Sequence, residues 1–262
     1  MTLMSVESPS VNRDVVLKAK QQHLQMRERR SPWSAVVALA SMQLPPLGIL
    51  NYVDDRVALI GQVRRTRPIY DPVAAAMDMI HAGADAIAFY TDHMVYASDL
   101  EDMYLLSRAC RGVPVVYQNY VLNIYQVAAA RAANASAIWI NSSLHTAPSL
   151  RANVTTAQRF RFAVFVSVNT LDELKAAVAL SPHVLCIGDP DQTDVAAAAR
   201  WLQQVRASIP SYIKPMLGHT LRTPEEVRLA LEAGARAVVV DAALLVRSKI
   251  ANVVHQWMRE AR

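Results

Sequence analysis

Short apolar runs alternate with alanine-rich segments along most of the chain. The first run, residues 57–63, is followed at once by a polar and cationic stretch that ends at Pro68. Continuous apolar runs of this length are typical of strands that are buried on both faces of a parallel sheet. Seven more such runs follow, and together the eight cover residues 57–63, 86–90, 113–117, 137–140, 163–168, 184–187, 212–217 and 237–240.

The segments between these runs have the composition and spacing of amphipathic helices. The clearest predicted helices cover residues 73–82, 125–133, 171–179, 195–207 and 224–233. A further helix is predicted over residues 15–30, and another segment runs from Ser31 to the turn at Pro45-Pro46. Strands that alternate with helices indicate a parallel α/β architecture.

A repeated junction favours a barrel over an open sheet. Residues 82–87, 133–138 and 233–238 each place Gly or Asn in a helix C-terminal turn directly before a strand. At roughly 25 residues per unit, these junctions precede strands two, four and eight. An open doubly wound sheet is the alternative, but no glycine-rich phosphate loop follows the first run. We therefore expect a (β/α)8 TIM barrel with an N-terminal helical extension.

Length and composition predict one domain. A chain of 262 residues with 53% hydrophobic content has the typical size of a single α/β barrel. We expect residues 1–13 to be disordered and residues 14–262 to form the domain with its N-terminal helices. The sequence shows neither a signal peptide nor an apolar run long enough for a membrane helix, so we expect a soluble, cytoplasmic protein without membrane contact. It gives no indication of an oligomeric state.

Charge and cysteine content narrow the classes of partner and cofactor. The net charge is +5, with a cationic cluster over residues 18–30 that favours a solvated helix face over a nucleic-acid site. Cys110 and Cys186 lie far apart and lack the spacing of a metal site, so buried thiols are expected. No histidine pairing suits a metal, and we expect no metal and no cofactor.

Active sites of such barrels lie where the strands end, and the residues there are mostly neutral. Asp92 is a candidate site residue or a helix cap, Asp189 is a candidate acid or base at a strand end, and Asp191 is a turn residue. His219 is expected in a loop after the seventh strand, where packing does not require a histidine. The other candidate binding residues are Gln62, Arg64, Gln118, Asn119, Asn141, Ser167 and Asn169.

Strands seven, eight and one are neighbours in a closed barrel, which brings their end residues together. His219, Asp241, Gln62 and Arg64 are therefore expected to converge as an acid/base and anion-holding group. In this reading Arg64 holds a carboxylate by a bidentate contact. The alternatives are that Asp241 caps the last barrel helix and that Arg64 forms a salt bridge to Asp241.

The chain resembles the indole-3-glycerol phosphate synthase family from the N-terminal helix to strand eight. The resemblance is carried by Thr91-Asp92 after strand two, the run Pro114-Val-Val-Tyr-Gln-Asn-Tyr-Val-Leu-Asn-Ile-Tyr-Gln126 through strand three, and Val166-Ser-Val-Asn-Thr-Leu-Asp-Glu-Leu174 at strand five. The third-strand run is the most specific. It implies a TIM barrel and, in the family, a ring closure with loss of carbon dioxide and water.

The residues that the family uses for this chemistry differ here. By the resemblance, Gln62 and Arg64 stand where the family has a glutamate and a lysine, Gln118 replaces the lysine general acid, and Ser167 replaces the glutamate general base. The family's phosphate-holding Gly-Ser after strand eight falls on Asp241-Ala242, where a carboxylate repels an anion. We therefore expect the synthase activity to be absent and the ligand to lack a phosphate at that end.

Two functions fit these departures. The first is a repurposed enzyme with lyase-like or cyclisation chemistry in secondary metabolism. It acts on a carboxylate-bearing small molecule, with His219, Asp189 and Asp241 as acid/base residues. The recruitment of tryptophan enzymes by natural-product pathways supports this reading by analogy. The second is a catalytically inactive homologue that binds a ligand or regulates a partner protein.

Overall fold

Eight parallel strands close into a barrel in chain order. The computed structural model describes residues 13–49, 57–64, 70–92, 98–189, 193–248 and 250–254. Each strand pairs with its two neighbours in sequence, and β8 pairs with β1 to complete the closure. The strands are β1 Ala58–Val63, β2 Ala86–Tyr90, β3 Val115–Gln118, β4 Ala137–Asn141, β5 Ala163–Val168, β6 Val184–Ile187, β7 Lys214–Leu221 and β8 Ala237–Asp241. The predicted TIM barrel is confirmed.

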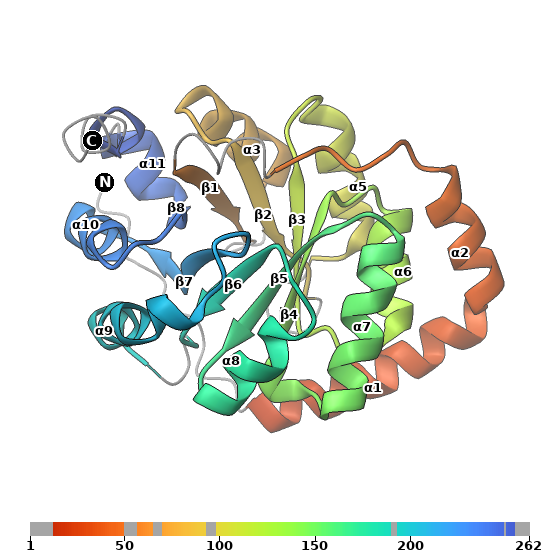
Figure 1. Ribbon diagram of the computed structural model, residues 1–262. Helices are drawn as coiled ribbons and strands as arrows, with labels where there is room; N and C mark the ends of the chain where they lie inside the picture. The colour runs from red at the N-terminus through yellow and green to blue at the C-terminus, as the bar shows by residue number, and fades with distance from the viewer. Residues whose placement is uncertain are drawn as a thin grey trace.

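Helices surround the barrel on its outer side (Figure 1). Most begin at a side-chain cap of the kind that stabilises a helix N-terminus, such as Asp71, Asn123 and Thr223. The helices that follow the strands are α3 Pro72–His81, α5 Leu100–Ala109, α6 Ile124–Ala132, α7 Ala147–Arg159, α8 Leu171–Val178, α9 Val195–Val205, α10 Pro224–Glu232 and α11 Ala242–Ser248. The described residues also include two short 3-10 helices, η2 Ser142–Leu144 and η3 Arg206–Ser208.

Two further helices, α1 Arg13–Arg30 and α2 Trp33–Met42, precede the barrel and form the predicted extension. α1 runs along the end of the barrel at which the strands terminate, and α2 packs beside α6 (Figure 1). α1 starts at Arg13, so this residue is helical although we expected it in a disordered tail. Residues 1–12 lie outside the described residues.

The predicted junctions have the backbone that they require. Gly83, Asn134 and Gly234 adopt φ values of 100°, 64° and 92°, in the left-handed region. Each follows a helix and precedes β2, β4 or β8. Glycine and asparagine tolerate this conformation, which explains why the junction repeats in the sequence.

The apolar core has two layers, one inside the barrel and one between the barrel and its helices. The inner layer consists of small and medium side chains from alternate strand positions, and Trp139 and Phe165 are its largest members. Ile49, which precedes β1 and is 1% exposed, belongs to this inner layer. Its chain segment is held by a hydrogen bond from Leu47 N to Ser136 Oγ, next to the start of β4. Ile49 therefore closes the N-terminal end of the barrel.

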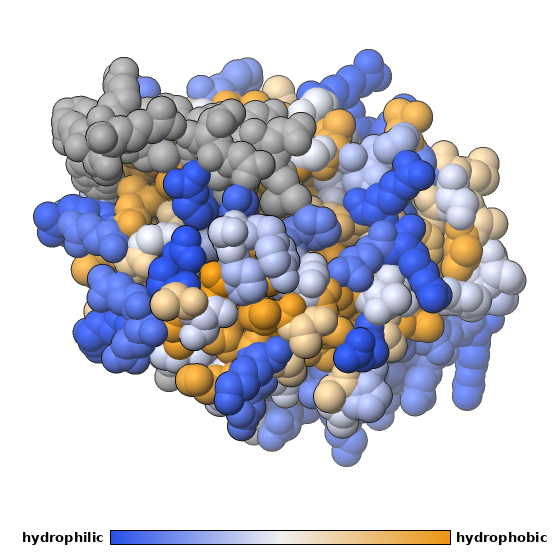
Figure 2. Space-filling model, viewed as in Figure 1, coloured by the Kyte–Doolittle hydropathy of each residue, from blue (hydrophilic) through white to orange (hydrophobic). Residues whose placement is uncertain are grey.

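The surface is largely hydrophilic around the outline of the molecule, whereas apolar side chains gather near the middle of the face in Figure 2. Cys110 and Cys186 are both buried free thiols, as expected. Within the described residues, no helix is both long enough and apolar enough to cross a bilayer.

Candidate ligand site at the barrel mouth

The β1, β3 and β7 side of the mouth is closed by neutral side chains that satisfy one another. Gln62 Nε2 donates to Gln118 Oε1 at 2.7 Å, and Thr220 Oγ1 donates to Gln62 Oε1 at 2.7 Å. These three side chains share the inward face of their strands, because Gln62 lies two positions beyond Ile60 of the inner layer. The network contains no group that can transfer a proton near neutral pH.

Ser167 has a structural partner inside the barrel. Its Oγ accepts a hydrogen bond from Trp139 Nε1 at 2.5 Å, and both side chains are buried. Cys186 contacts the same serine, and burial raises the pKa of the Cys186 thiol well above its ordinary value. Ser167 therefore fixes the indole ring of Trp139 at the floor of the mouth.

Ionisable and amide groups gather instead on the β4 to β6 side. The Asp189 side chain, which follows β6 and is 4% exposed, accepts from Arg13 Nη1 and from Asn141 Nδ2, each at 3.4 Å to Oδ2. Arg13 Nη2 donates to Ser143 Oγ at 3.1 Å. The first residue of α1 thus meets the ends of β4 and β6.

Asn169 lies in the same arc, and its side-chain polar atoms have no partner among the described residues. It follows β5 on the inward face, two positions beyond Ser167, and its neighbour Val168 pairs in register with Ile187. Its Nδ2 and Oδ1 atoms are both buried and have no hydrogen-bond partner within the described part of the chain. Buried amides are nearly always hydrogen-bonded, so this side chain indicates a place for a ligand or water.

Aromatic rings and two cations border this arc. Tyr90 and Tyr120 meet edge to face, with ring centroids 6.4 Å apart. The Arg13 guanidinium carbon and Lys20 Nζ lie 5.8 Å and 5.9 Å from the centre of the Tyr120 ring. Distances of this order allow cation–π attraction, so Tyr120 links β3 to α1.

Asp92 forms an ion pair with Lys20 of α1. Lys20 Nζ lies 2.6 Å from Asp92 Oδ2, and both side chains are buried. Burial lowers the pKa of the Lys20 ammonium, and the negative charge of Asp92 opposes that effect. A cavity of about 50 Å³ beside Lys20 extends between α1 and α6. Asp92 thus forms a long-range ion pair with α1, and residues 93–97, which it would cap, lie outside the described residues.

Asn119 faces the helix layer. Its Nδ2 donates to the Thr91 carbonyl oxygen, to Thr91 Oγ1 at 3.0 Å and to the Tyr117 hydroxyl at 3.1 Å. Tyr117 belongs to the outer apolar layer. Asn119 therefore braces β2 against β3 beside the cavity and does not line the barrel axis.

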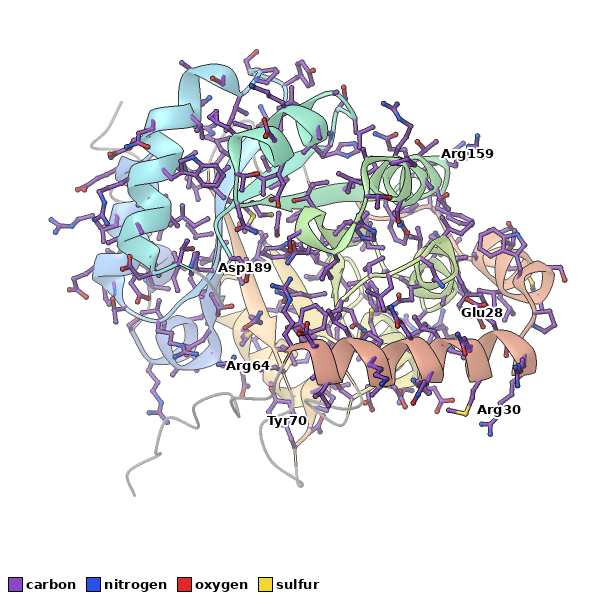
Figure 3. All side chains as sticks on the ribbon, turned by 90° about the horizontal axis from the view of Figure 1, so that it is seen from below. Glu28, Arg30, Arg64, Tyr70, Arg159 and Asp189 are labelled. Carbon is purple, nitrogen blue, oxygen red and sulfur yellow. The ribbon has the colours of Figure 1, made fainter. Side chains whose placement is uncertain are left out.

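Arg64 continues the inward face of β1 beyond Gln62. It lies close to Tyr70, where burial raises the pKa of the tyrosine hydroxyl to about 12 and the positive charge of Arg64 works in the opposite direction. Figure 3 views this face of the molecule and shows Arg64 and Asp189 near the N-terminal end of α1. Arg64 therefore supplies a cation beside Tyr70 after the end of β1.

His219 is not in a loop, because β7 continues to Leu221. Its ring faces the segment before α9, where His219 Nε2 lies 2.8 Å from the Thr193 carbonyl oxygen. The neighbouring Gly218 packs so closely on Gly188 that an added Cβ would lie 2.2 Å from the Gly188 oxygen. The histidine side chain is thus on the helix side of the strand, away from Gln62, and the expected convergence does not form.

Asp241 caps the helix that follows it. Its Oδ1 accepts a hydrogen bond from Leu244 N at 2.9 Å, at the start of α11. The alternative of a helix cap therefore describes this contact. Asp191, which the sequence predicts to be a turn residue, lies outside the described residues.

Sequence reasoning missed Arg13 and Lys20. The cationic run of α1 predicted a solvated face, yet Lys20 is buried together with Val16 and Leu24. The spacing of four residues places all three on one helix face, and a lysine in an apolar stripe was the available signal. Among the described residues, no group of three His, Cys, Asp or Glu side chains is arranged to hold a metal ion.

Comparisons with known proteins agree with the architecture. A family model described as indole-3-glycerol phosphate synthase matches residues 14–257. The chain is 25% identical over 240 residues to indole-3-glycerol phosphate synthase of Lactiplantibacillus plantarum, covering 88% of this chain and 92% of that protein. It is 26% identical over 236 residues to the same enzyme of Leifsonia xyli subsp. xyli, covering 87% and 90%.

Solved structures show the fold alone. Tryptophan synthase subunit alpha of Legionella pneumophila str. Paris matches with a TM-score of 0.57 and 14% identity, covering 75% of this chain and 87% of that chain. N-acetylmannosamine-6-phosphate 2-epimerase of Clostridium perfringens matches with a TM-score of 0.61 and 14% identity, covering 80% and 96%.

Proposed function

Because the chain belongs to the indole-3-glycerol phosphate synthase family, we propose that it is a repurposed member that binds a small, non-phosphorylated carboxylate at the barrel mouth. The observation that carries this proposal is the hydrogen bond between Gln62 and Gln118. By the resemblance, these amides occupy the positions of a glutamate and of the lysine general acid. A neutral pair cannot perform the proton transfers of the family reaction.

The ligand is held from two sides in this proposal. Arg64 at the end of β1 binds the carboxylate, since its planar guanidinium suits a bidentate contact. Asn141 and Asn169 supply amide contacts on the opposite side, where the Asn169 side chain has both of its polar atoms unpaired within the described residues. Asp241 disfavours a phosphate after β8, because its carboxylate is negatively charged.

Asp189 is the acid/base residue in the proposed reaction. It is buried and lies at the end of β6 beside Arg13 and Asn141. We remove His219 and Asp241 from this role, since His219 contacts the Thr193 carbonyl group and Asp241 caps α11. The reaction class is lyase-like or a cyclisation, in a pathway of secondary metabolism.

A catalytically inactive ligand-binding or partner-regulating homologue is the second candidate. The observation that favours it is the closed set formed by Gln62, Gln118 and Thr220, which leaves the floor of the mouth without a reactive group. The two candidates share a ligand site and differ only in turnover.

The experiment uses the purified full-length chain. Calorimetry should detect binding of aromatic carboxylates such as anthranilate and indole-3-propionate, and Arg64→Gln should weaken it about tenfold or more. Arg159→Gln on the outer end of α7 is the matched control. Indole fluorescence should detect no product from the anilino-deoxyribulose phosphate substrate, and indole formation at an ordinary enzymatic rate would refute the proposal.

Turnover of each bound ligand is then followed by mass spectrometry. Loss of turnover in Asp189→Asn, measured at ligand concentrations that saturate the variant, supports the repurposed enzyme. Binding without turnover in the unmodified protein supports the inactive homologue.

A further inference from the structure

We infer that the natural ligand is a zwitterion of the aromatic amino acid class. Asp189 binds its ammonium group, and Arg13 binds its carboxylate. This inference rests on the proposed carboxylate-binding function and assigns the chemical class of its ligand. It places the ligand carboxylate on Arg13, so a loss of affinity in Arg13→Gln but not in Arg64→Gln distinguishes it from the contact proposed above. The juxtaposition that carries it is the contact between Arg13 and Asp189 on the β4 to β6 side of the mouth.

α1 fixes Arg13 in place. The helix is held by the buried Lys20–Asp92 pair, and near its other end Tyr125 donates to the Ser31 carbonyl oxygen at 2.9 Å. Val16 and Leu24 bury the same helix face. Because these contacts are spread along the helix, they fix the position of its first residue, Arg13, next to the ends of β4 and β6.

The Arg13 guanidinium has N–H donors that its contacts within the described residues do not use. Its hydrogen bonds within the described residues go to Asp189 and Ser143, and a guanidinium carries more N–H groups than these two contacts use. Its side chain is 23% exposed, so an incoming group has access. Since the contact to Asp189 is long, at 3.4 Å, a ligand carboxylate has room to join or replace it on the guanidinium.

A simple carboxylate is a poor occupant of this position. Asp189 is 4% exposed and carries a carboxylate, so a second carboxylate beside it would be repelled in a poorly solvated site. An ammonium group on the carbon next to the ligand carboxylate removes this repulsion, because it pairs with Asp189 while the carboxylate pairs with Arg13.

The unpartnered amide of Asn169 matches the same ligand. It offers one acceptor and one donor, Oδ1 and Nδ2, both buried and unpaired within the described residues. An ammonium can donate to Oδ1, and a carboxylate oxygen can accept from Nδ2. The aromatic pair Tyr90 and Tyr120 borders the site, where an apolar ring can pack.

The test is a set of three ligands that share one ring. L-Tryptophan carries both charged groups, indole-3-propionate lacks the amine, and tryptamine lacks the carboxylate. A second set with L-phenylalanine, 3-phenylpropionate and phenethylamine covers a smaller ring. By titration calorimetry, we expect at least one amino acid to bind about tenfold or more tightly than both of its analogues.

Substitutions then assign each charge. Asp189→Asn should weaken the amino acid and spare the propionate, whereas Arg13→Gln should weaken both carboxylates and spare the amine. Asp172→Asn in α8 and Arg159→Gln in α7 are exposed controls, and thermal melting verifies that each variant is folded.

The outcomes separate the two proposals. Equal or tighter binding of the propionate, or an unchanged affinity for the amino acid in Arg13→Gln or Asp189→Asn, overturns the zwitterion and leaves the carboxylate site. Absence of binding by every carboxylate overturns both.

Discussion

Lys20 Nζ lies 2.6 Å from Asp92 Oδ2, and this buried contact joins the N-terminal helix to the end of β2. The two residues are 72 positions apart in the chain. A buried ion pair is held by mutual compensation, since each charge has lost its water. Together with the buried Val16 and Leu24, the pair therefore holds α1 over the mouth.

Removal of one partner should destabilise the protein more than removal of both. Lys20→Met removes the buried cation that lies beside Asp92, and we expect a loss of about 3 to 5 kcal/mol in the free energy of unfolding. The double variant Lys20→Met, Asp92→Leu should recover most of this loss. Urea denaturation of the unmodified protein, Lys20→Met, Asp92→Leu and the double variant gives the coupling energy of the pair. Single effects that add up in the double variant would contradict the buried pair.

Ser167 should prove to be a structural residue. Ser167→Ala leaves Trp139 Nε1 buried without its acceptor, which typically costs about 1 to 3 kcal/mol of stability. In a Trp139→Phe background, where the donor is absent, the same substitution should cost much less. Urea denaturation provides the comparison, and an equal cost in both backgrounds would show that the hydrogen bond contributes nothing.

Two glycines in the barrel strands should respond differently to alanine. A Cβ at Gly218 would meet the Gly188 carbonyl oxygen at 2.2 Å, which only a backbone shift between β6 and β7 can relieve. A Cβ at Gly61 would meet Met79 Sδ at 2.6 Å, and a flexible thioether can move aside. We expect Gly61→Ala to cost about 1 to 3 kcal/mol and Gly218→Ala to cost more, as measured by urea denaturation. The reverse order would contradict the assigned contacts.

Acid should weaken the fold through a buried histidine. Val164 N donates to His183 Nδ1 at 3.0 Å, a contact that requires the neutral ring, and burial lowers the pKa of His183. Below pH about 6.5 the unfolded chain takes up the proton first, so the free energy of unfolding falls as the pH drops from 7 towards 5.

The control for this pH effect is His183→Asn, whose Oδ1 can accept from Val164 N without titrating. Its stability should change less over the same pH range in urea denaturation. Burial also lowers the pKa of His145, so this residue contributes to the same fall in the free energy of unfolding at low pH. An identical pH dependence in the variant would exclude His183 as the cause.

The fold followed from the sequence because each strand carries its own local signal. The apolar runs predicted β2, β5 and β6 to the residue, and the repeated turns at Gly83, Asn134 and Gly234 identified the units. β7 is the exception. Its apolar run ends at Leu217, but the strand continues with a register irregularity to Leu221, so the position of His219 was assigned wrongly.

The site was harder to predict because its contacts are long-range. Asp189 was placed at the mouth by strand counting alone. Arg13 was not, since nothing near it in the chain shows that a helix end will reach β6, 176 positions away. The outward direction of His219 follows from alternation along β7, since Met216 belongs to the inner layer and Leu217 and Leu221 to the outer one, but this reasoning requires the strand to continue beyond Leu217.

Ile49 fills the N-terminal end of the barrel and belongs to its packed interior. Within the described residues, a ligand therefore approaches the barrel from the opposite end, beside α1 (Figure 3). A change in how firmly α1 is seated should alter the rates of ligand uptake and release together.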